Sequence, residues 1–204
     1  MAMGMALAEF LQDGERAPGR GDRKEHFMQG IVKKGKRLHF RQAEEKDLDY
    51  ILEVEFRPEN GRFVIPWGRA VHRETLDTEG AIHLIIERMD TEEPVGFLMI
   101  AGLNNPSKEM EWTRIILDKK GEGYGHETLK MLKSWAFDDL GFHRAWLDCK
   151  DYNARALHVY ESEGLVREGL IRETILTDGV YENLVILGIL DREYFARKER
   201  GEEL

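Results

Sequence analysis

Three glycines at alternate positions stand out in the run KGEGYG, residues 120–125, because a helical pattern follows immediately. Glycine costs roughly 0.5–1 kcal/mol relative to alanine in regular structure, so this concentration needs a reason. Without a side chain, glycine lets backbone N–H groups approach a ligand, and the start of the next helix adds a partial positive charge. The run therefore predicts a phosphate-binding loop, with a plain flexible turn as the alternative.

The residues around the glycines separate three kinds of phosphate-binding loop. A P-loop requires Gly-Lys-Ser/Thr, whereas Gly125 is followed by His126 and Glu127. A dinucleotide fingerprint requires G-x-G-x-x-G, and the spacing G-x-G-x-G here disfavours an NAD-binding oxidoreductase. The pyrophosphate loop for coenzyme A, Gln/Arg-x-x-Gly-x-Gly/Ala, fits from Lys120 to Gly125 with lysine as the one departure.

A second constellation follows the loop. Asn153 and Tyr160 are seven residues apart, which is two helical turns, so both side chains face roughly the same side of a helix. The seven histidines are scattered, and HETLK at residues 126–130 lacks the second histidine of a HExxH zinc helix, so we expect no metal site.

The elements that must position these residues can be read from periodicity. Alternation and β-branched runs predict strands at 37–43, 81–88, 94–103, 110–117 and 143–150, and a hairpin over 165–190 that turns at Asp178-Gly179. Helical spacing predicts helices at 44–56, 67–76, from the glycine loop to 139, and 152–164, the last two ended by Gly141 and Gly164. The order predicts a mixed α/β fold, neither a strict βαβ series nor a barrel.

The combination of these pieces resembles the GNAT acyltransferase superfamily, over roughly residues 37–190. The loop at 120–125, the stretch DYNARALHVYESEGLVREG at 151–169, the opening RLHFRQAEEKDLDYIL and the final hairpin all resemble that family. The branch that includes ribosomal-protein N-terminal acetyltransferases and spermidine N-acetyltransferases is the most similar. The resemblance implies a mostly antiparallel central sheet that is splayed at the cofactor site, with helices on both faces.

It also implies where acetyl-CoA would bind. Backbone groups of Arg114, Ile115 and Ile116, on the strand at 110–117, would hold the pantetheine arm and polarise the thioester carbonyl. His126 would donate to a phosphate, and Asn153 would either bond the arm or cap its helix. The pyrophosphate would lie on Lys120, Gly121, Glu122, Gly123, Tyr124 and Gly125.

The implied chemistry is attack of a primary amine on the thioester by direct transfer. Tyr160 resembles the family's general acid, which protonates the departing thiolate, and Glu111 is the candidate base. Glu55 and His72 are weaker alternatives, on helices that normally cover the acceptor, and Trp67 could line the acceptor pocket. Two alternatives without catalysis remain open. Tyr160 and Glu111 could be exposed side chains on a helix and a strand with no catalytic role. The whole domain could also be a catalytically silent sensor that binds acyl-CoA.

Composition sets the outer limits. The chain has 204 residues and one cysteine, Cys149, so it cannot form an intrachain disulfide. Its net charge of −9 disfavours direct binding of nucleic acid. No apolar run approaches the length of a membrane span, and the N-terminus does not read as a signal peptide, so we expect a cytoplasmic enzyme. We expect an N-terminal tail at 1–35, which could be partly derived from an expression vector, an acetyltransferase domain at 36–190, and a tail or short helix at 191–204. The resemblance leaves the acceptor open between a protein N-terminal amine and a polyamine or other small amine, and it allows for a homodimer.

Overall fold

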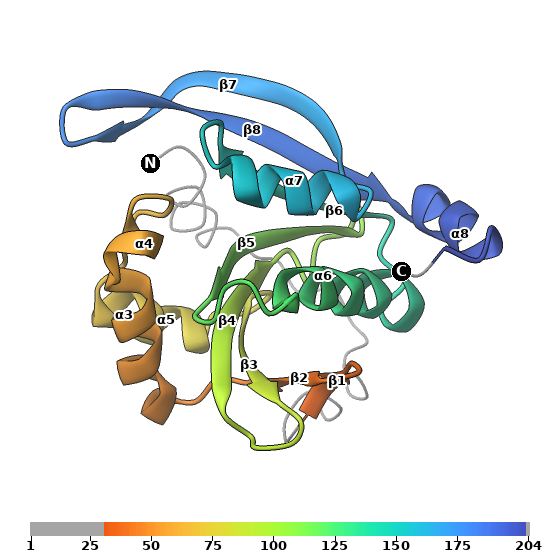
Figure 1. Cartoon of the computed structure of the whole chain (residues 1–204), viewed down its shortest axis with the longest axis horizontal. Helices are drawn as coiled ribbons and strands as arrows, with labels where there is room; N and C mark the ends of the chain where they lie inside the picture. The colour runs from red at the N-terminus through yellow and green to blue at the C-terminus, as the bar shows by residue number, and fades with distance from the viewer. Residues whose placement is uncertain (1–30, 203–204) are drawn as a thin grey trace.

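An eight-stranded sheet forms the centre of the computed structural model, which describes residues 31–202 (Figure 1). Its strand order is β1-β2-β3-β4-β5-β6-β8-β7. Only β5 and β6 run parallel, and the other neighbours are antiparallel. The predicted mixed α/β fold with a mostly antiparallel sheet is confirmed. The strands are β1 (Ile31–Lys34), β2 (Leu38–Gln42), β3 (Ile82–Arg88), β4 (Pro94–Ala101), β5 (Glu109–Leu117), β6 (Arg144–Lys150), β7 (Val166–Thr177) and β8 (Val180–Leu190).

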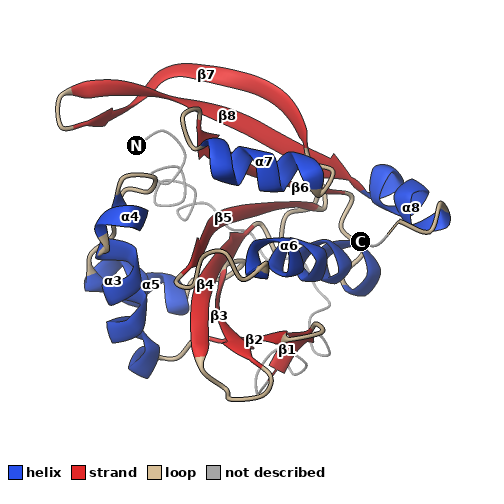
Figure 2. Cartoon of the chain, viewed as in Figure 1, coloured by secondary structure: helices blue, strands red, loops and turns tan. Residues whose placement is uncertain are grey.

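Helices cover both faces of the sheet, as Figure 2 shows. One core cluster packs Leu129 and Leu132 of α6 and Leu157 of α7 against the sheet. A second cluster packs Leu48 and Ile51 of α3 against the opposite face. The helices are α3 (Leu48–Phe56), α4 (Pro58–Gly61), α5 (Arg69–Leu76), α6 (Tyr124–Ser134), α7 (Ala154–Ser162) and α8 (Asp191–Glu199), with a 3₁₀ turn η3 (Glu45–Asp47) and a π-helical turn η4 (Trp135–Asp139).

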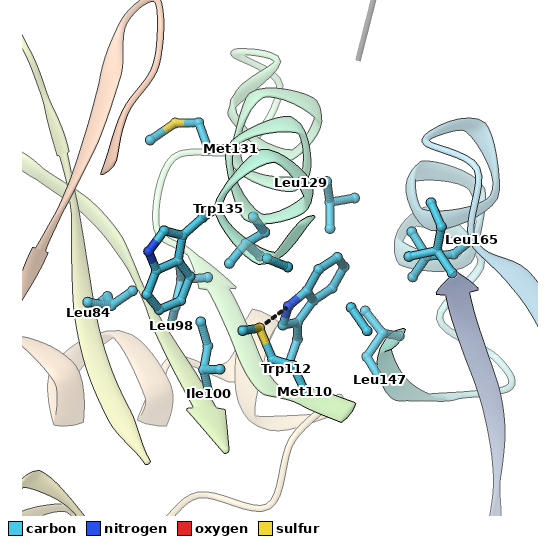
Figure 3. Packing of buried hydrophobic residues seen from close by; sticks show 14 of the residues in the cluster. Leu84, Leu98, Ile100, Met110, Trp112, Leu129, Met131, Trp135, Leu147 and Leu165 are labelled. Carbon is cyan, nitrogen blue, oxygen red and sulfur yellow. Dashed lines mark hydrogen bonds between the residues drawn. The ribbon is translucent and has the colours of Figure 1, made fainter. Parts of the chain in front are cut away.

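Strands β3 and β4 are buried on both faces, which explains their nearly continuous apolar sequences. Figure 3 shows the larger cluster, in which Trp112 lies beside Met110, Leu129 and Leu147. The indole Nε1–H of Trp112 donates to Met110 Sδ at 3.3 Å. Bulky side chains thus connect β5 to α6 and β6, the elements that carry the candidate site.

The structure differs from the sequence prediction mainly at element ends. Strand β1 pairs with β2, so the sheet begins inside the segment predicted as a tail. Its four residues, IVKK, do not alternate and follow a polar run, so the sequence shows no recognisable strand pattern there. Helix α4 lies in the segment predicted as a loop. The predicted hairpin turn is confirmed, with φ of 50° at Asp178 and 82° at Gly179. Residues 1–30 of the predicted tail lie outside the described residues.

Candidate active site

Strands β5 and β6 separate and leave a cavity between them. Their parallel pairing runs from Glu109 with Arg144 to Glu111 with Trp146, and within the described residues it goes no further. The cavity has a volume of about 1120 Å³. Its walls come from β5, β6, the start of α6, α7 and the segment 59–71. The predicted splay of the sheet is therefore present, and it lies where the two candidate motifs meet.

A β-bulge in β5 sets which way its residues face. Ala101 pairs with Glu111 and Met99 pairs with Arg114, so β5 has one residue more than β4 in this interval. Before the bulge, Trp112 packs in the cluster with α6, whereas after it Ile116 packs in the cluster with α3. The extra residue therefore reverses the alternation of side chains along β5 and disrupts the ladder at the cavity.

The register decides which backbone groups of β5 face the gap. Asp118 N–H donates to Val95 O at 2.8 Å, and Arg114 and Ile116 fall in phase with Asp118 along the same antiparallel ladder. Because hydrogen-bonded pairs alternate, Arg114 and Ile116 direct their backbone groups to β4, and Ile115 and Leu117 direct theirs toward β6. Of the three residues predicted to bind the pantetheine arm through their backbone, only Ile115 directs its backbone groups into the gap. Leu117 does so as well, and the sequence reasoning missed it.

The glycine loop ends at the start of α6, on the cavity wall. Gly121 has φ of 91°, and Gly123, the residue before α6, has φ of 77°. These left-handed conformations explain the two glycines, because other residues adopt them at a cost. Gly121, Gly123, Tyr124 and Gly125 line the cavity, and the first N–H groups of α6 have no acceptor within a helix that begins there.

Two charged residues of the loop take different positions. Lys120 lines the cavity and donates to Asn60 Oδ1 of α4 at 2.7 Å, and burial lowers the pKa of its ammonium group. Glu122 is absent from the cavity wall, and its carbonyl accepts a hydrogen bond from Arg37 at 2.9 Å. Glu122 therefore anchors the loop from outside, because its side chain is exposed and its backbone is bonded to the N-terminal part of the sheet.

His126 and Asn153 both line the cavity, and each has a structural bond as well. His126 Nδ1 lies 2.9 Å from Glu163 Oε1, a carboxylate that also accepts from buried Lys133 at 2.8 Å. Asn153 Oδ1 accepts from Ala156 N–H at 3.3 Å, which caps α7. The cap predicted as one alternative for Asn153 is confirmed, and contact with the pantetheine arm stays a prediction.

Tyr160 projects from α7 into the same cavity as Asn153. Within residues 31–202 its hydroxyl has no hydrogen-bond partner. Burial, and then the nearby Cys149 and Asp148, raise the pKa of this hydroxyl well above its ordinary value. The group is therefore protonated at neutral pH and is available as a proton donor to a ligand. Cys149 itself is buried, and burial raises the pKa of its thiol to about 12.

Two carboxylates lie where the strands begin to part. Burial, and then Asp148 and Glu109, raise the pKa of Glu111 to about 7. Burial also raises the pKa of Asp148, against the opposing charge of Arg114. Both residues line the cavity. The sequence reasoning missed Asp148, although a lone carboxylate between Leu147 and Cys149 in an apolar strand was a usable signal.

The acceptor-side candidates divide between the wall and the layer behind it. Trp67 lines the cavity, whereas Glu55 and His72 have fully buried side chains and are absent from its wall. Glu55 Oε2 accepts from His72 Nε2 at 2.9 Å and from Trp67 N–H at 2.9 Å. Burial lowers the pKa of His72 to about 4, so its imidazole is neutral at pH 7. The structure thus places the direct-contact candidates Glu55 and His72 behind Trp67, because α3 and α5 turn these faces toward each other.

Comparison with known proteins decides the family. The family described as acetyltransferase (GNAT) domain matches residues 37–166, which is more than half of the chain. The chain belongs to the GNAT acetyltransferase family. The match includes the glycine loop, Asn153 and Tyr160, and it ends at the first residue of β7.

The GNAT relatives include spermidine N(1)-acetyltransferases. That of Vibrio cholerae is 26% identical over 106 residues, 52% of this chain and 61% of the relative. That of Escherichia coli is 25% identical over 114 residues, 55% of this chain and 61% of the relative. The probable N-acetyltransferase YjcK of Bacillus subtilis is 24% identical over 122 residues, 59% of this chain and 67% of the relative. The chain thus matches about three fifths of the length of the two spermidine acetyltransferases.

Solved GNAT structures share the fold. A spermidine N-acetyltransferase from Vibrio cholerae, crystallised with CoA and spermine, gives a TM-score of 0.70 at 20% identity and covers 78% of this chain and 98% of its own. A dodecameric form of the Vibrio cholerae enzyme gives a TM-score of 0.67 at 21% identity, covering 79% and 98%. The β7–β8 hairpin, which adds Ile175 and Leu184 to the cavity wall, falls almost wholly outside the family match.

Neither a metal cluster nor a membrane-spanning helix is found in residues 31–202. No group of three or more His, Cys, Asp or Glu side chains in this part of the chain could hold a metal ion. No helix there is long and apolar enough to span a membrane.

Proposed function

We propose that this GNAT protein transfers an acetyl group from acetyl-CoA to a primary amine, and that a polyamine is the acceptor. The observation that carries the proposal is the cavity between β5 and β6. It brings to one space a glycine loop, a tyrosine hydroxyl with no hydrogen-bond partner in residues 31–202, and two carboxylates with raised pKa values. Each of these matches one part of the reaction.

The cavity fits acetyl-CoA at three points. The gap-facing backbone groups of Ile115 and Leu117 can pair with the amides of the pantetheine arm as a neighbouring strand would. The first turn of α6 presents N–H groups to a pyrophosphate, and the helix dipole favours its negative charge. Lys120 and Arg155 add positive charge to the same wall.

The chain's own groups can complete the transfer. The amine nitrogen attacks the thioester carbon, a C–N bond forms and the C–S bond breaks. Glu111, with a pKa of about 7, can take the proton that the amine loses, directly or through a water molecule. Tyr160 can give its proton to the departing thiolate. An N–H group of β5 at the gap can donate to the carbonyl oxygen as negative charge develops there.

The acceptor end of the cavity supports a cationic alkyl amine. Phe63, Ile65 and Trp67 supply apolar surface, while Glu111 and Asp148 supply two carboxylates. A polyamine alternates methylene groups with ammonium groups, so it can bury its alkyl chain and leave one charge beside Asp148 while another amine meets Glu111. The spermidine acetyltransferases among the relatives support the same class.

Calorimetry with acetyl-CoA, and with NAD as control, is the first test. Micromolar binding of acetyl-CoA without NAD binding is expected, followed by thiol release with spermidine or spermine. A peptide with a free N-terminus tests the alternative acceptor, and preference for it would overturn the polyamine assignment. Binding of acetyl-CoA without turnover on any amine would favour the silent sensor, and absence of binding by folded protein would reject the proposal.

A further inference from the structure

The acceptor-side wall of the cavity is made by a segment that has no regular structure. Residues 62–68, between α4 and α5, include Ile65 and Trp67, both of which line the cavity. A wall of this kind needs side-chain contacts to hold its shape, because no ladder or helix fixes its backbone. Lys150 and Tyr152 hold the start of the segment by donating to Arg62 O. At Ile65 and Trp67 the contacts come from two buried charged residues, Arg114 of β5 and Glu55 of α3.

Arg114 contacts the segment at two points. Its Nη2 donates to Ile65 O at 3.0 Å. Its guanidinium carbon lies 4.6 Å from the centroid of the Trp67 ring, within the range of a cation–π contact. The arginine therefore holds both the backbone at Ile65 and the ring of Trp67, and it does so from the strand that carries the bulge.

Glu55 completes the arrangement from the other side. One carboxylate oxygen forms an ion pair with Arg114, and the other accepts from Trp67 N–H at 2.9 Å and from His72 Nε2 at 2.9 Å. The Glu55 side chain is 0% exposed and that of Arg114 is 8% exposed. Because His72 is neutral, the charge that balances Glu55 is that of Arg114.

A buried ion pair is weak evidence for stability, since desolvation of two charges offsets most of their attraction. The pair instead supplies orientation, because a planar guanidinium and a carboxylate hold their partners at defined angles. Four groups are held in this way: Ile65 O, the Trp67 ring, Trp67 N–H and His72 Nε2. All of those partners belong to the acceptor side or to the helix behind it. Among the described residues, no side-chain contact of Arg114 or Glu55 reaches the glycine loop.

We propose that Arg114 and Glu55 are positioning residues that set acceptor recognition by holding Ile65 and Trp67 in place. The inference rests on the proposed amine acetylation. It assigns Glu55 and His72 a role different from direct contact with the amine, since they act on the acceptor through Trp67. Without the ion pair, the segment of Ile65 and Trp67 is free to move, and the acceptor must order it on binding. The affinity for the acceptor therefore falls, whereas the affinity for acetyl-CoA stays the same.

The test replaces both charges together, because removal of one would leave the other buried and unpaired. In the double variant E55L–R114M, the KM for spermidine is expected to rise about tenfold or more, with the calorimetric Kd of acetyl-CoA within about twofold of wild type. The variant R114K keeps the charge but loses the planar contacts, so it is expected to fall between wild type and the double variant. Because R114K keeps both charges paired, it also serves as the test if the double variant does not fold.

The matched control is a partly buried ion pair away from the cavity. Arg41 Nε lies 2.8 Å from Glu87 Oε1, and neither residue lines the cavity. Arg41 also donates to Asp47 at 2.7 and 2.8 Å, so the control variant R41M–D47N–E87L removes all three charges together, and it is expected to leave the KM for spermidine unchanged. A rise in KM equal to that of E55L–R114M would show a general effect of lost stability and overturn the inference.

A double-mutant cycle with W67A distinguishes a positioning role of the ion pair from a merely structural one. If the ion pair acts through the indole, the exchange E55L–R114M is expected to add less than about twofold to the KM of a W67A protein. Fully additive effects, an unchanged KM, or equal losses of acetyl-CoA and spermidine affinity would each overturn the inference. Failure of the wild-type protein to bind acetyl-CoA or acetylate an amine would instead reject the underlying function.

Discussion

At the scale of single residues, Tyr160 carries the most direct prediction. Its hydroxyl faces the cavity without a partner in residues 31–202, and its raised pKa keeps it protonated. Replacing Tyr160 with Phe is expected to lower kcat by about 10²–10³-fold, because general acid catalysis is lost. The Kd of acetyl-CoA, measured by calorimetry, should change little. A Y160F enzyme with wild-type kcat would mean that another group protonates the thiolate.

Glu111 predicts the pH dependence of the reaction. With a pKa of about 7, Glu111 is protonated below neutral pH and cannot take a proton from the amine. The rate kcat/KM is therefore expected to fall below pH 7 with an inflection near that value, separate from the rise due to the amine's own ionisation at higher pH. The variant E111Q should lose this inflection. E109Q, two residues away and outside the cavity wall, should keep an inflection at a somewhat lower pH, because Glu109 contributes to the raised pKa of Glu111. The same inflection in E111Q would exclude Glu111 as the base.

The same carboxylate links function to stability. Its pKa rises from an ordinary value of 4.5 in the unfolded chain to about 7 in the fold, so the folded state binds the proton more tightly. The stability that this group contributes is therefore present below about pH 4.5 and is lost as the pH rises to 7. E111Q is expected to raise the free energy of unfolding at pH 8 by roughly 1–3 kcal/mol over wild type, and by much less at pH 4. Denaturant unfolding at the two pH values checks this, and an equal difference at both would contradict it.

At the scale of elements, the glycine loop joins conformation to binding. Gly123 precedes α6 with φ of 77°, and an added Cβ would meet only the flexible end of Arg37 at 3.5 Å. The variant G123A is therefore expected to be destabilised by backbone strain of about 1 kcal/mol, and to bind acetyl-CoA more weakly because the first N–H groups of α6 shift. The variant G169A, at an open position of β7, is the control. Full acetyl-CoA affinity in G123A would argue against the phosphate cradle.

The elements themselves were largely predictable, and their irregularities were not. Periodicity identified the strands from residue 37 to the hairpin and the helices that end near Gly141 and Gly164, because each has a long apolar face. The bulge in β5 depends on its pairing with β4, so the reading of Arg114, Ile115 and Ile116 as equivalent could not anticipate it. The ladder leaves Ile115 and Leu117 facing the gap, a distinction that only the register provides.

At the scale of the whole molecule, the sequence motifs predicted which parts meet but not the depth at which side chains lie. The glycine loop, Asn153 and Tyr160 line one cavity as their spacing suggested. Glu55 and His72 are on the predicted helices, yet the rotation of those helices buries both side chains behind Trp67. Such rotations arise from packing between distant segments, which a single sequence does not report.

The charge of the whole protein predicts how acceptors of different charge respond to salt. A net charge of −9 attracts a polycation at long range, and Glu111 and Asp148 extend that field into the cavity. Screening shortens the range of this attraction from about 10 Å at 0.1 M salt to about 3 Å at 1 M. The kcat/KM for spermidine is therefore expected to fall severalfold over this range, while that for butylamine, with one charge, falls less. Steady-state kinetics with both amines at saturating acetyl-CoA measure the difference. Equal salt dependence for spermidine and butylamine would show that the acceptor end interacts only with the reacting amine. The second ammonium group of spermidine would then have no partner in the cavity.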